Sequence, residues 1–366
     1  RQRRVACCSP FGSISIGGRS FPPSGNRGYE SNRLFCFSSS PPAPGTFVLS
    51  SMTGSCVSRC CRTVGCVLGL WACHYELLGT DEDTILQLLT ARSNNQRQEI
   101  KATYKTLFGK DLVDDLKSEL GGKFETLVVG LMTPPNAYDV ELLRNAIKGA
   151  GTDEKVLIEI LASRTAIQVR DIIAAYKQEY DDDLEEDVTG DTDGHFKRML
   201  VILLQASRQQ GIQEGKIDSD AQALFAAGEQ KYGTDEEQFI SILGNRSAAH
   251  LRRVFEAYMK LSGYEIEESI KRETSRHLET VLLAVVKCAR SVPAYFAEML
   301  YYAMKGAGTD DQTLIRIMVS RSEIDMLDIR TEFRRMFAAT LHDTIKGDTS
   351  GDYRKAMLLL CGGNDA

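Results

Sequence analysis

The chain of 366 residues has no apolar run of about 18 residues, the length that a membrane-spanning helix needs. After residue 78 it also lacks an excess of positive charge: 48 acidic and 36 basic residues give a net charge of −12. Nucleic acid is therefore not expected as a partner, because no basic stripe is available to neutralise phosphates. Only Cys288 and Cys361 follow position 73, so this body is expected to be a reduced, cytosolic protein.

Residues 1–73 differ in composition from this body and are expected to form an atypical, disordered leader. Residues 1–78 contain eight arginines, no lysine and two acidic residues, and the stretches FPPSGNRG and SSSPPAPG cannot build a core. Met52, two arginines and the apolar stretch VGCVLGLWAC have some features of a signal peptide. The thiols of CVSRCC lack a second Cys/His pair, so a zinc site is not expected.

Catalytic and nucleotide-binding motifs are missing as well. The five histidines show no HExxH spacing, and GAGTDE and GAGTDD lack the third glycine of a dinucleotide fingerprint. In DVTGDTDGHFKRML, placing Gly194 at the sixth position of an EF-hand loop puts Leu200 where the bidentate glutamate belongs. Nothing in the sequence demands an enzyme.

What the sequence does contain is a fourfold repeat. KGAGTDD at 305–311 nearly copies KGAGTDE at 148–154, and partial copies stand at LLGTDED (77–83) and KYGTDEE (231–237). The glycine before each threonine is Gly79, Gly151, Gly233 and Gly308. Thirteen residues later each copy has an arginine: Arg92, Arg164, Arg246 and Arg321. Forty residues after the glycine each has a carboxylate: Glu119, Asp191, Glu273 and Asp348. Three landmarks at fixed offsets in four copies indicate a true repeat.

Each repeat reads as helical. In the second copy the apolar stripes before and after the loop have helical spacing, as in Val140, Leu143, Ala146 and Ile147. The acid-rich YDDDLEEDV is expected to be a short helix or a solvated loop. The sequence therefore predicts an all-α fold with about five helices per repeat.

The glycine-rich loop has a structural and a functional interpretation. As a simple helix–turn–helix corner, it would use glycine to end one helix and Thr152 or Thr309 as the N-cap of the next. The carboxylate forty residues on favours a metal site, because loop carbonyls and one distant acid offer the hard oxygen ligands that Ca²⁺ prefers. A helical scaffold for protein partners, with purely structural loops, is the alternative function and has no need of that carboxylate.

With GxGT and a carboxylate forty residues on, four times over 79–366, the chain resembles the annexin family. The resemblance implies a curved disc of four five-helix repeats that binds several Ca²⁺ ions and docks on anionic, phosphatidylserine-rich membranes. It places the repeats at 74–134, 135–208, 209–292 and 293–366, the first with a missing or altered first helix. It also implies self-association as a trimer on the membrane, an anticoagulant or phospholipase-shielding role, and a cytoplasmic, membrane-peripheral or extracellular location.

The family pattern also implies the ligands of each site. The second site would use carbonyls of Ile147, Gly149 and Gly151 with Asp191, and the fourth Met304, Gly306 and Gly308 with Asp348. The third would use Gly228, Lys231, Gly233 and Glu273, with Tyr232 either facing lipid or packed on the protein. The first keeps Gly79 and Glu119, but Leu77 replaces a loop glycine, so an impaired site is expected. The four repeated arginines are expected to cap helix carbonyls rather than bind phosphate.

Overall fold

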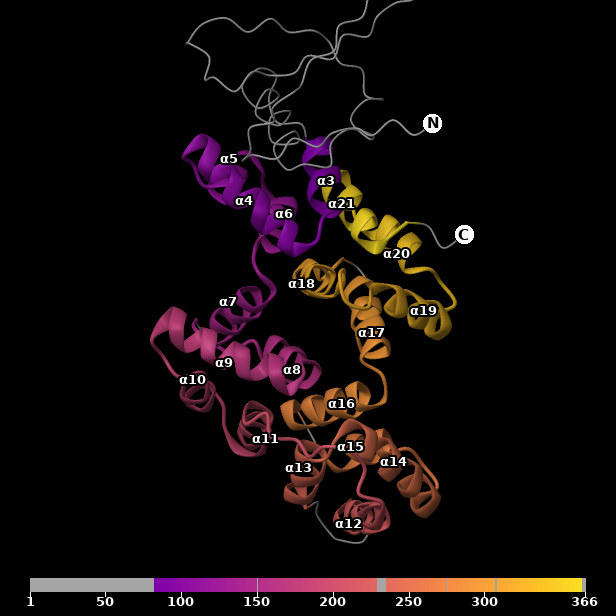
Figure 1. Cartoon of the computed structure of the whole chain (residues 1–366). Coiled ribbons are helices and arrows are strands. Elements are labelled where there is room, and N and C mark those ends of the chain that lie inside the picture. The colour runs from indigo at the N-terminus through magenta and orange to yellow at the C-terminus, as the bar shows by residue number, and fades with distance from the viewer. Residues whose placement is uncertain (1–81, 150, 229–234, 275, 307, 364–366) are drawn as a thin grey trace, which may run out of the picture. The chain divides into compact units, whose positions relative to one another are not determined.

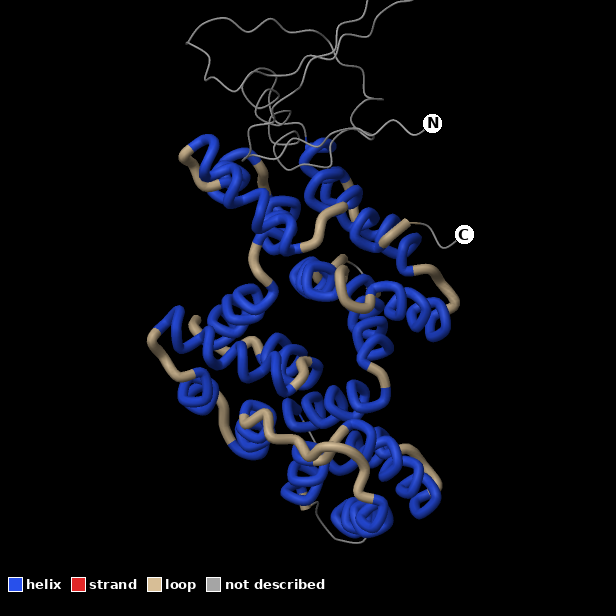
Figure 2. Tube along the Cα trace, in the orientation of Figure 1, coloured by secondary structure: helices blue, strands red, loops and turns tan. Residues whose placement is uncertain are grey.

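The structure is a computed structural model that describes residues 82–149, 151–228, 235–274, 276–306 and 308–363. The expected leader, the altered first helix of the first repeat, Gly79, Lys231, Tyr232 and Gly233 lie outside the described residues. In the part that is described every regular element is a helix; most of the connecting loops are short, and a longer one covers residues 205–213 between α11 and η1 (Figure 2). The all-α prediction is confirmed.

The helices follow one another along the chain in four groups (Figure 1). The first group is α3 (Glu82–Thr90), α4 (Asn94–Phe108), α5 (Leu112–Glu119) and α6 (Gly122–Met132). The second is α7 (Pro135–Ile147), α8 (Glu154–Ser163), α9 (Ala166–Tyr180), α10 (Leu184–Asp191) and α11 (Gly194–Leu204). The third is the 3-10 helix η1 (Glu214–Lys216), α12 (Ile217–Gly228), α13 (Glu236–Asn245), α14 (Ala248–Ser262), α15 (Ile266–Glu273) and α16 (Arg276–Arg290). The fourth is α17 (Val292–Met304), α18 (Asp311–Arg321), α19 (Met326–Phe337), α20 (Leu341–Asp348) and α21 (Gly351–Cys361).

These groups correspond to the four predicted repeats, called the first to the fourth repeat below. The second, third and fourth each hold five α-helices, as predicted, and the acid-rich YDDDLEEDV contributes the short helix α10. Asp183 caps α10 by accepting hydrogen bonds from the backbone N–H groups of Glu185 and Glu186. A side-chain cap of this kind satisfies N–H groups that have no partner within the helix.

The core follows the predicted apolar stripes. In α7, Val140, Leu143, Ala146 and Ile147 are all buried. Within each of the last three repeats the first and third α-helices pack together, α7 on α9, α12 on α14 and α17 on α19. Full burial of one leucine such as Leu143 contributes about 2 kcal/mol, so the sum over such a core far exceeds any single polar contact.

Repeats also pack across the chain in pairs. Helix α8 packs on α16 and α11 on α13, which joins the second repeat to the third. Helix α6 packs on α18 and α3 on α21, which joins the first repeat to the fourth. None of the described helices is both long and apolar enough to span a membrane.

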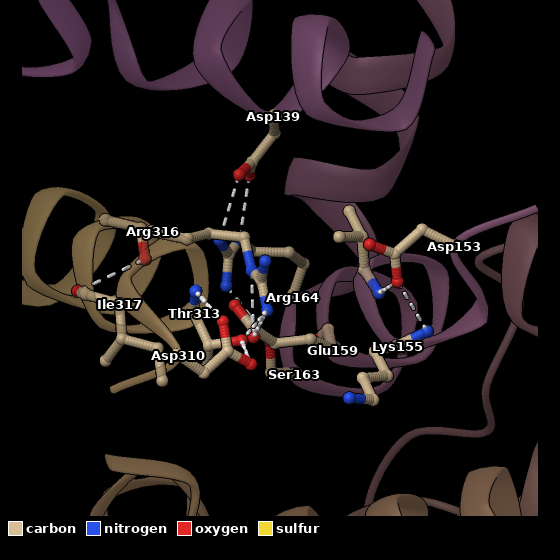
Figure 3. A network of polar contacts seen from close by, with 12 residues as sticks. Asp139, Asp153, Lys155, Glu159, Ser163, Arg164, Asp310, Thr313, Arg316 and Ile317 are labelled. Carbon is tan, nitrogen blue, oxygen red and sulfur yellow. Dashed lines mark hydrogen bonds and ion pairs between the residues drawn. The ribbon is translucent and has the colours of Figure 1, made fainter. Parts of the chain in front are cut away.

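A buried polar network connects the second repeat to the fourth (Figure 3). Arg316 of α18 donates from Nε and Nη2 to one oxygen of Glu159 in α8, at 3.0 and 2.7 Å. Glu159 is fully buried and Arg316 nearly so. A guanidinium and a carboxylate are tolerated at such depth because each neutralises the other.

Candidate functional site

The loop of the second repeat runs from Lys148, where α7 ends, to Asp153, where α8 begins. The backbone N–H of Asp153 donates to the carbonyl of Ala146 at 2.8 Å and closes the loop at its base. Gly151 has φ of 105°, a conformation that glycine adopts at little cost and other residues avoid. The loop thus reverses direction within a few residues.

The loop of the fourth repeat has the same construction. The N–H of Asp310 donates to the carbonyl of Ala303 at 2.7 Å, and Gly306 and Gly308 have φ of 123° and 115°. Positive φ therefore calls for glycine at both predicted positions of the fourth loop, but only at Gly151 in the second, because Gly149 does not have positive φ. A tight glycine turn of this kind leaves main-chain carbonyl oxygens without helical partners, and these oxygens could serve as ligands of a cation.

The residues that cap the following helices differ from the prediction. Asp153, not Thr152, caps α8, and Asp310, not Thr309, caps α18. The predicted threonine caps are wrong because an aspartate follows each threonine, and its carboxylate accepts N–H hydrogen bonds within the first turn.

Each loop threonine instead contacts the acidic residue that lies 39 positions later in the chain. Thr152 Oγ1 donates to the main-chain carbonyl of Asp191 at 3.2 Å. Thr309 Oγ1 lies 3.2 Å from the carbonyl of Asp348 and 2.8 Å from its Oδ2. The structure thus brings each GxGT loop to the end of α10 or α20, where the predicted acid stands.

In the third repeat the structure describes two of the four predicted calcium ligands, Gly228 and Glu273. Gly228 ends α12, and a Cβ placed on it would lie 3.4 Å from Cγ of Glu273, which ends α15. The loop base is closed as in the second and fourth repeats, because the N–H of Asp235 donates to the carbonyl of Ala227 at 3.0 Å. The remaining predicted ligands, Lys231 and Gly233, lie outside the described residues, as does Tyr232.

In the first repeat Glu119 is the last residue of α5, the same place in its helix as Asp191, Glu273 and Asp348 hold in theirs. It lines a cavity of about 480 Å³ that Asp348 also lines, between the first and the fourth repeat. Lys123 and Asp311 form an ion pair in the wall of this cavity. Gly79, its predicted loop partner, lies outside the described residues.

A second threonine per repeat was not singled out from the sequence. Thr192, Thr274 and Thr349 directly follow the carboxylates, and each hydroxyl donates to the carbonyl four residues earlier, at 2.6 to 2.8 Å. The bond closes the C-terminal end of the helix that carries the acid. The signal was present in the sequence, since threonine recurs at this offset in three repeats, but the first repeat has Leu120 there.

The repeated arginines act inside the protein, although not on helix carbonyls as predicted. Arg164 donates to both oxygens of Asp139 at 2.7 and 2.9 Å, and Arg246 to both oxygens of Asp220 at 2.6 and 2.9 Å. Each pair fastens the loop after the second helix of a repeat to its first helix.

The other two arginines lack this partner. In the fourth repeat Phe296 stands at the place of these aspartates, and Arg321 lies over its ring at 4.7 Å from the centroid. Arg321 also forms an ion pair with Asp325. Arg92 donates to the carbonyl of Ala91, the residue that follows α3, at 3.3 Å, so this arginine does not bind a carbonyl within the helix either.

The donor set around the loops fits a hard cation. Backbone carbonyls and one carboxylate are oxygen ligands, the kind that Ca²⁺ binds with six to eight contacts in a flexible geometry. Thr309 already ties Asp348 to its loop, and the described residues place no Lys or Arg side chain in an ion pair with Asp191 or Asp348. A cation therefore meets no competing charge at these two carboxylates.

Comparison with known proteins agrees with this geometry. The annexin family model matches residues 75–131, 138–203, 219–285 and 295–360, one match for each repeat. The chain belongs to the annexin family. It is 66% identical to annexin A5 of Gallus gallus over 290 residues, which are 79% of this chain and 90% of that protein. It is 65% identical to annexin A5 of Homo sapiens over the same length, 79% of this chain and 91% of that protein.

A solved structure confirms the fold of this annexin. The structure of chicken annexin V aligns with a TM-score of 0.78 at 63% identity, covering 82% of this chain and 96% of that one. The family assignment made from GxGT and the distant carboxylate is therefore confirmed, and so is the four-repeat fold. As an annexin, the protein binds Ca²⁺ and binds phospholipid membranes in a calcium-dependent way.

Proposed function

We propose that this annexin binds Ca²⁺ at three complete loops and one impaired loop, and through these ions binds phosphatidylserine-rich membranes. The repeats would run over residues 74–134, 135–208, 209–292 and 293–366. The ligands would be carbonyls of Ile147, Gly149 and Gly151 with Asp191; Gly228, Lys231 and Gly233 with Glu273; and Met304, Gly306 and Gly308 with Asp348. The observation that carries the proposal is the contact of each described loop threonine with the acid 39 residues later.

The chemistry that the ions supply is charge reversal. After residue 78 the chain carries a net charge of −12, which opposes approach to an anionic surface. Each Ca²⁺ brings two positive charges to a loop and leaves coordination positions for phosphate or carboxylate oxygens of a lipid head group. Phosphatidylserine offers both groups, so it is favoured over a zwitterionic lipid. Tyr232 in the third loop would lie at the lipid interface, where an amphipathic ring is stable.

The first loop is proposed to contribute least. Leu77 stands where the second and fourth repeats have Gly149 and Gly306. Gly306 has φ of 123°, a conformation that a residue with a Cβ adopts only at a cost. Glu119 is nevertheless well placed at the end of α5. We therefore assign the first repeat a weak calcium site and the other three the main binding.

The cellular consequences follow from the same binding. A cytoplasmic protein with this chemistry would move to membranes when calcium rises, without any enzymatic step. On a surface that exposes phosphatidylserine outside the cell, it would shield that lipid from coagulation factors and phospholipases. Self-association into trimers on the membrane would multiply the contacts per particle and strengthen attachment.

The test is calcium-titrated co-sedimentation of the intact chain with vesicles of phosphatidylserine and phosphatidylcholine. We expect pelleting with the first lipid in millimolar Ca²⁺, release by excess EGTA, and no pelleting with pure phosphatidylcholine. Equal binding to both vesicles, or binding that survives EGTA, would contradict the proposal. A helical scaffold for protein partners, whose loops are structural, would bind neither vesicle.

A further inference from the structure

The threonines of the second and fourth loops do not make the same contact. Thr309 Oγ1 lies 2.8 Å from Oδ2 of Asp348, close enough for a hydrogen bond to the carboxylate itself. Thr152 Oγ1 contacts only the main-chain carbonyl of Asp191, at 3.2 Å. Among the described residues, no hydrogen bond to the carboxylate of Asp191 is found. The two loops share the sequence KGAGTD, so the difference lies in their local geometry: Gly306 has positive φ whereas Gly149 does not, and the two carboxylates are placed differently toward their loops.

This difference matters because both acids are exposed at the ends of their helices. An exposed aspartate samples several side-chain rotamers, and a cation that binds it must select one of them. A hydroxyl that donates to one carboxylate oxygen restricts this rotation before the cation arrives. It leaves the other oxygen free and a second lone pair on the bonded one, so coordination is not blocked.

The helix ends and the loop bases around the two acids are alike, although the loop backbones differ at Gly149 and Gly306. Thr349 closes the end of α20 with a hydrogen bond to Ile345, as Thr192 closes α10 with one to Val188. The base of each loop is closed by an aspartate N–H to an alanine carbonyl, at 2.7 and 2.8 Å. Within the described residues, the carboxylate of Asp348 therefore makes one polar contact that the carboxylate of Asp191 lacks: the hydrogen bond from the loop threonine.

We propose that Thr309 is a positioning residue for calcium: it holds the carboxylate of Asp348 toward the loop and makes the fourth site bind Ca²⁺ more tightly than the second. Thr152 has no such effect on Asp191. This inference rests on the proposed calcium ligands and adds to them an order of affinity between two loops of equal sequence. Removal of a residue that hydrogen-bonds to a metal ligand and orients it typically lowers metal affinity by about 10- to 100-fold.

The experiment isolates each site in the full chain. One background carries Glu119→Ala, Asp191→Ala and Glu273→Ala and keeps the fourth site; the other carries Glu119→Ala, Glu273→Ala and Asp348→Ala and keeps the second. Calcium affinity is measured by calorimetry without lipid, and the unfolding temperature is measured in EGTA. If the fourth-site background binds no calcium at all, the proposed ligand set fails, and that outcome is distinct from failure of the positioning role.

In the fourth-site background, Thr309→Val is expected to weaken calcium binding about tenfold, whereas Thr309→Ser keeps the hydroxyl and restores it. In the second-site background, the matched Thr152→Val is expected to change the affinity by less than about threefold, because it removes no contact to the carboxylate. The unfolding temperature in EGTA reports structural damage alone. If Thr309→Val lowers the unfolding temperature, the calcium affinities of Thr309→Ala and Thr309→Ser are compared instead. The positioning role then predicts weaker calcium binding for Thr309→Ala than for Thr309→Ser.

Two results would overturn the proposal. One is equal calcium affinity of Thr309→Val and Thr309→Ser. The other is an equal loss for Thr152→Val and Thr309→Val, which would assign both threonines the same role in shaping the loop backbone.

Discussion

The pair of Glu159 and Arg316 shows at the residue scale how charge is used inside this protein. Both side chains are buried, and they join α8 of the second repeat to α18 of the fourth (Figure 3). One oxygen of Glu159 accepts both hydrogen bonds, while its Oε1 is buried with no hydrogen-bond partner among the described residues. Such a pair contributes little net stability when intact but leaves a costly buried charge when one partner is removed.

Glu159→Gln is therefore expected to lower the free energy of unfolding by about 3 kcal/mol, since the charge of Arg316 loses its counter-ion. Urea denaturation in EGTA measures this. Glu179→Gln, on the exposed face of α9, removes the same charge and is expected to change stability by less than about 0.5 kcal/mol. Equal effects of the two substitutions would show that the pair does not hold the repeats together.

A second buried ionic cluster predicts an acid dependence of stability. Arg246 and His250 both donate to the carboxylate of Asp220, and Nδ1 of His250 accepts from the N–H of Gln213. Burial raises the pKa of Asp220, but these hydrogen bonds outweigh it, and the pKa lies below its ordinary value. The stability from this group is thus fully present above about pH 4 and is lost as pH falls through the lowered pKa.

Asp220→Asn should consequently destabilise the protein by about 2 kcal/mol at neutral pH, the contribution of hydrogen bonds to a charged group. The difference from the unsubstituted chain should begin to shrink below about pH 4, where Asp220 of the unfolded chain takes up a proton, and should continue to shrink as pH falls through the lowered pKa of the folded chain. Thermal unfolding from pH 7 to pH 3 tests this, with exposed Asp218→Asn in the same helix as control. A difference that stays constant with pH would argue against the carboxylate as its source.

At the scale of the element, most of the helical architecture could be predicted because apolar spacing fixes it. The stripe of α7 needed only periodicity, whereas for the acid-rich α10 the sequence left a short helix and a solvated loop both open. The cap of α8 could not be assigned in this way, because Thr152 and Asp153 are both good caps in sequence. The choice depends on where α10 ends, since Asp191 offers Thr152 a carbonyl to bind.

Asp153→Ala is expected to lower the free energy of unfolding by about 1 kcal/mol, because it removes the cap of α8. Thr152→Ala is expected to cost less, since Thr152 is not the cap. Urea midpoints in EGTA compare the two. A larger loss for Thr152→Ala would return the capping role to the threonine.

The carboxylates at the ends of the fourth helices could be predicted from the sequence, but their hydrogen bonds could not. Their forty-residue offset identified Asp191, Glu273 and Asp348, because each ends the fourth helix of its repeat and the helix lengths are nearly constant. The offset could not reveal that Thr309 reaches the carboxylate of Asp348 while Thr152 reaches only a carbonyl. Such a difference depends on side-chain orientation, which two copies of one motif do not encode by spacing. The ligand sets inferred for the loops, with Lys231, Gly233 and Gly79 outside the described residues, remain predictions.

At the scale of the whole molecule, membrane binding is expected to depend on several weak sites acting together. Each Ca²⁺ is held by a few oxygens and completed by lipid, so one site alone binds weakly. Sites joined in one folded chain bind a surface with an effective concentration that raises the overall affinity far above that of each. The calcium dependence of vesicle binding should therefore be steep, and loss of two sites should shift it strongly.

The most direct test is the calcium concentration for half-maximal binding to phosphatidylserine vesicles, measured for the intact chain and for Asp191→Asn with Asp348→Asn. The control, Glu185→Gln with Glu186→Gln, also removes two negative charges, both from α10, the helix that carries Asp191. The account predicts that the first pair raises the calcium requirement at least about tenfold, while the control, which has less net negative charge, leaves it unchanged or slightly lower. An unchanged requirement in the Asp191 and Asp348 variant would contradict calcium bridging through these carboxylates.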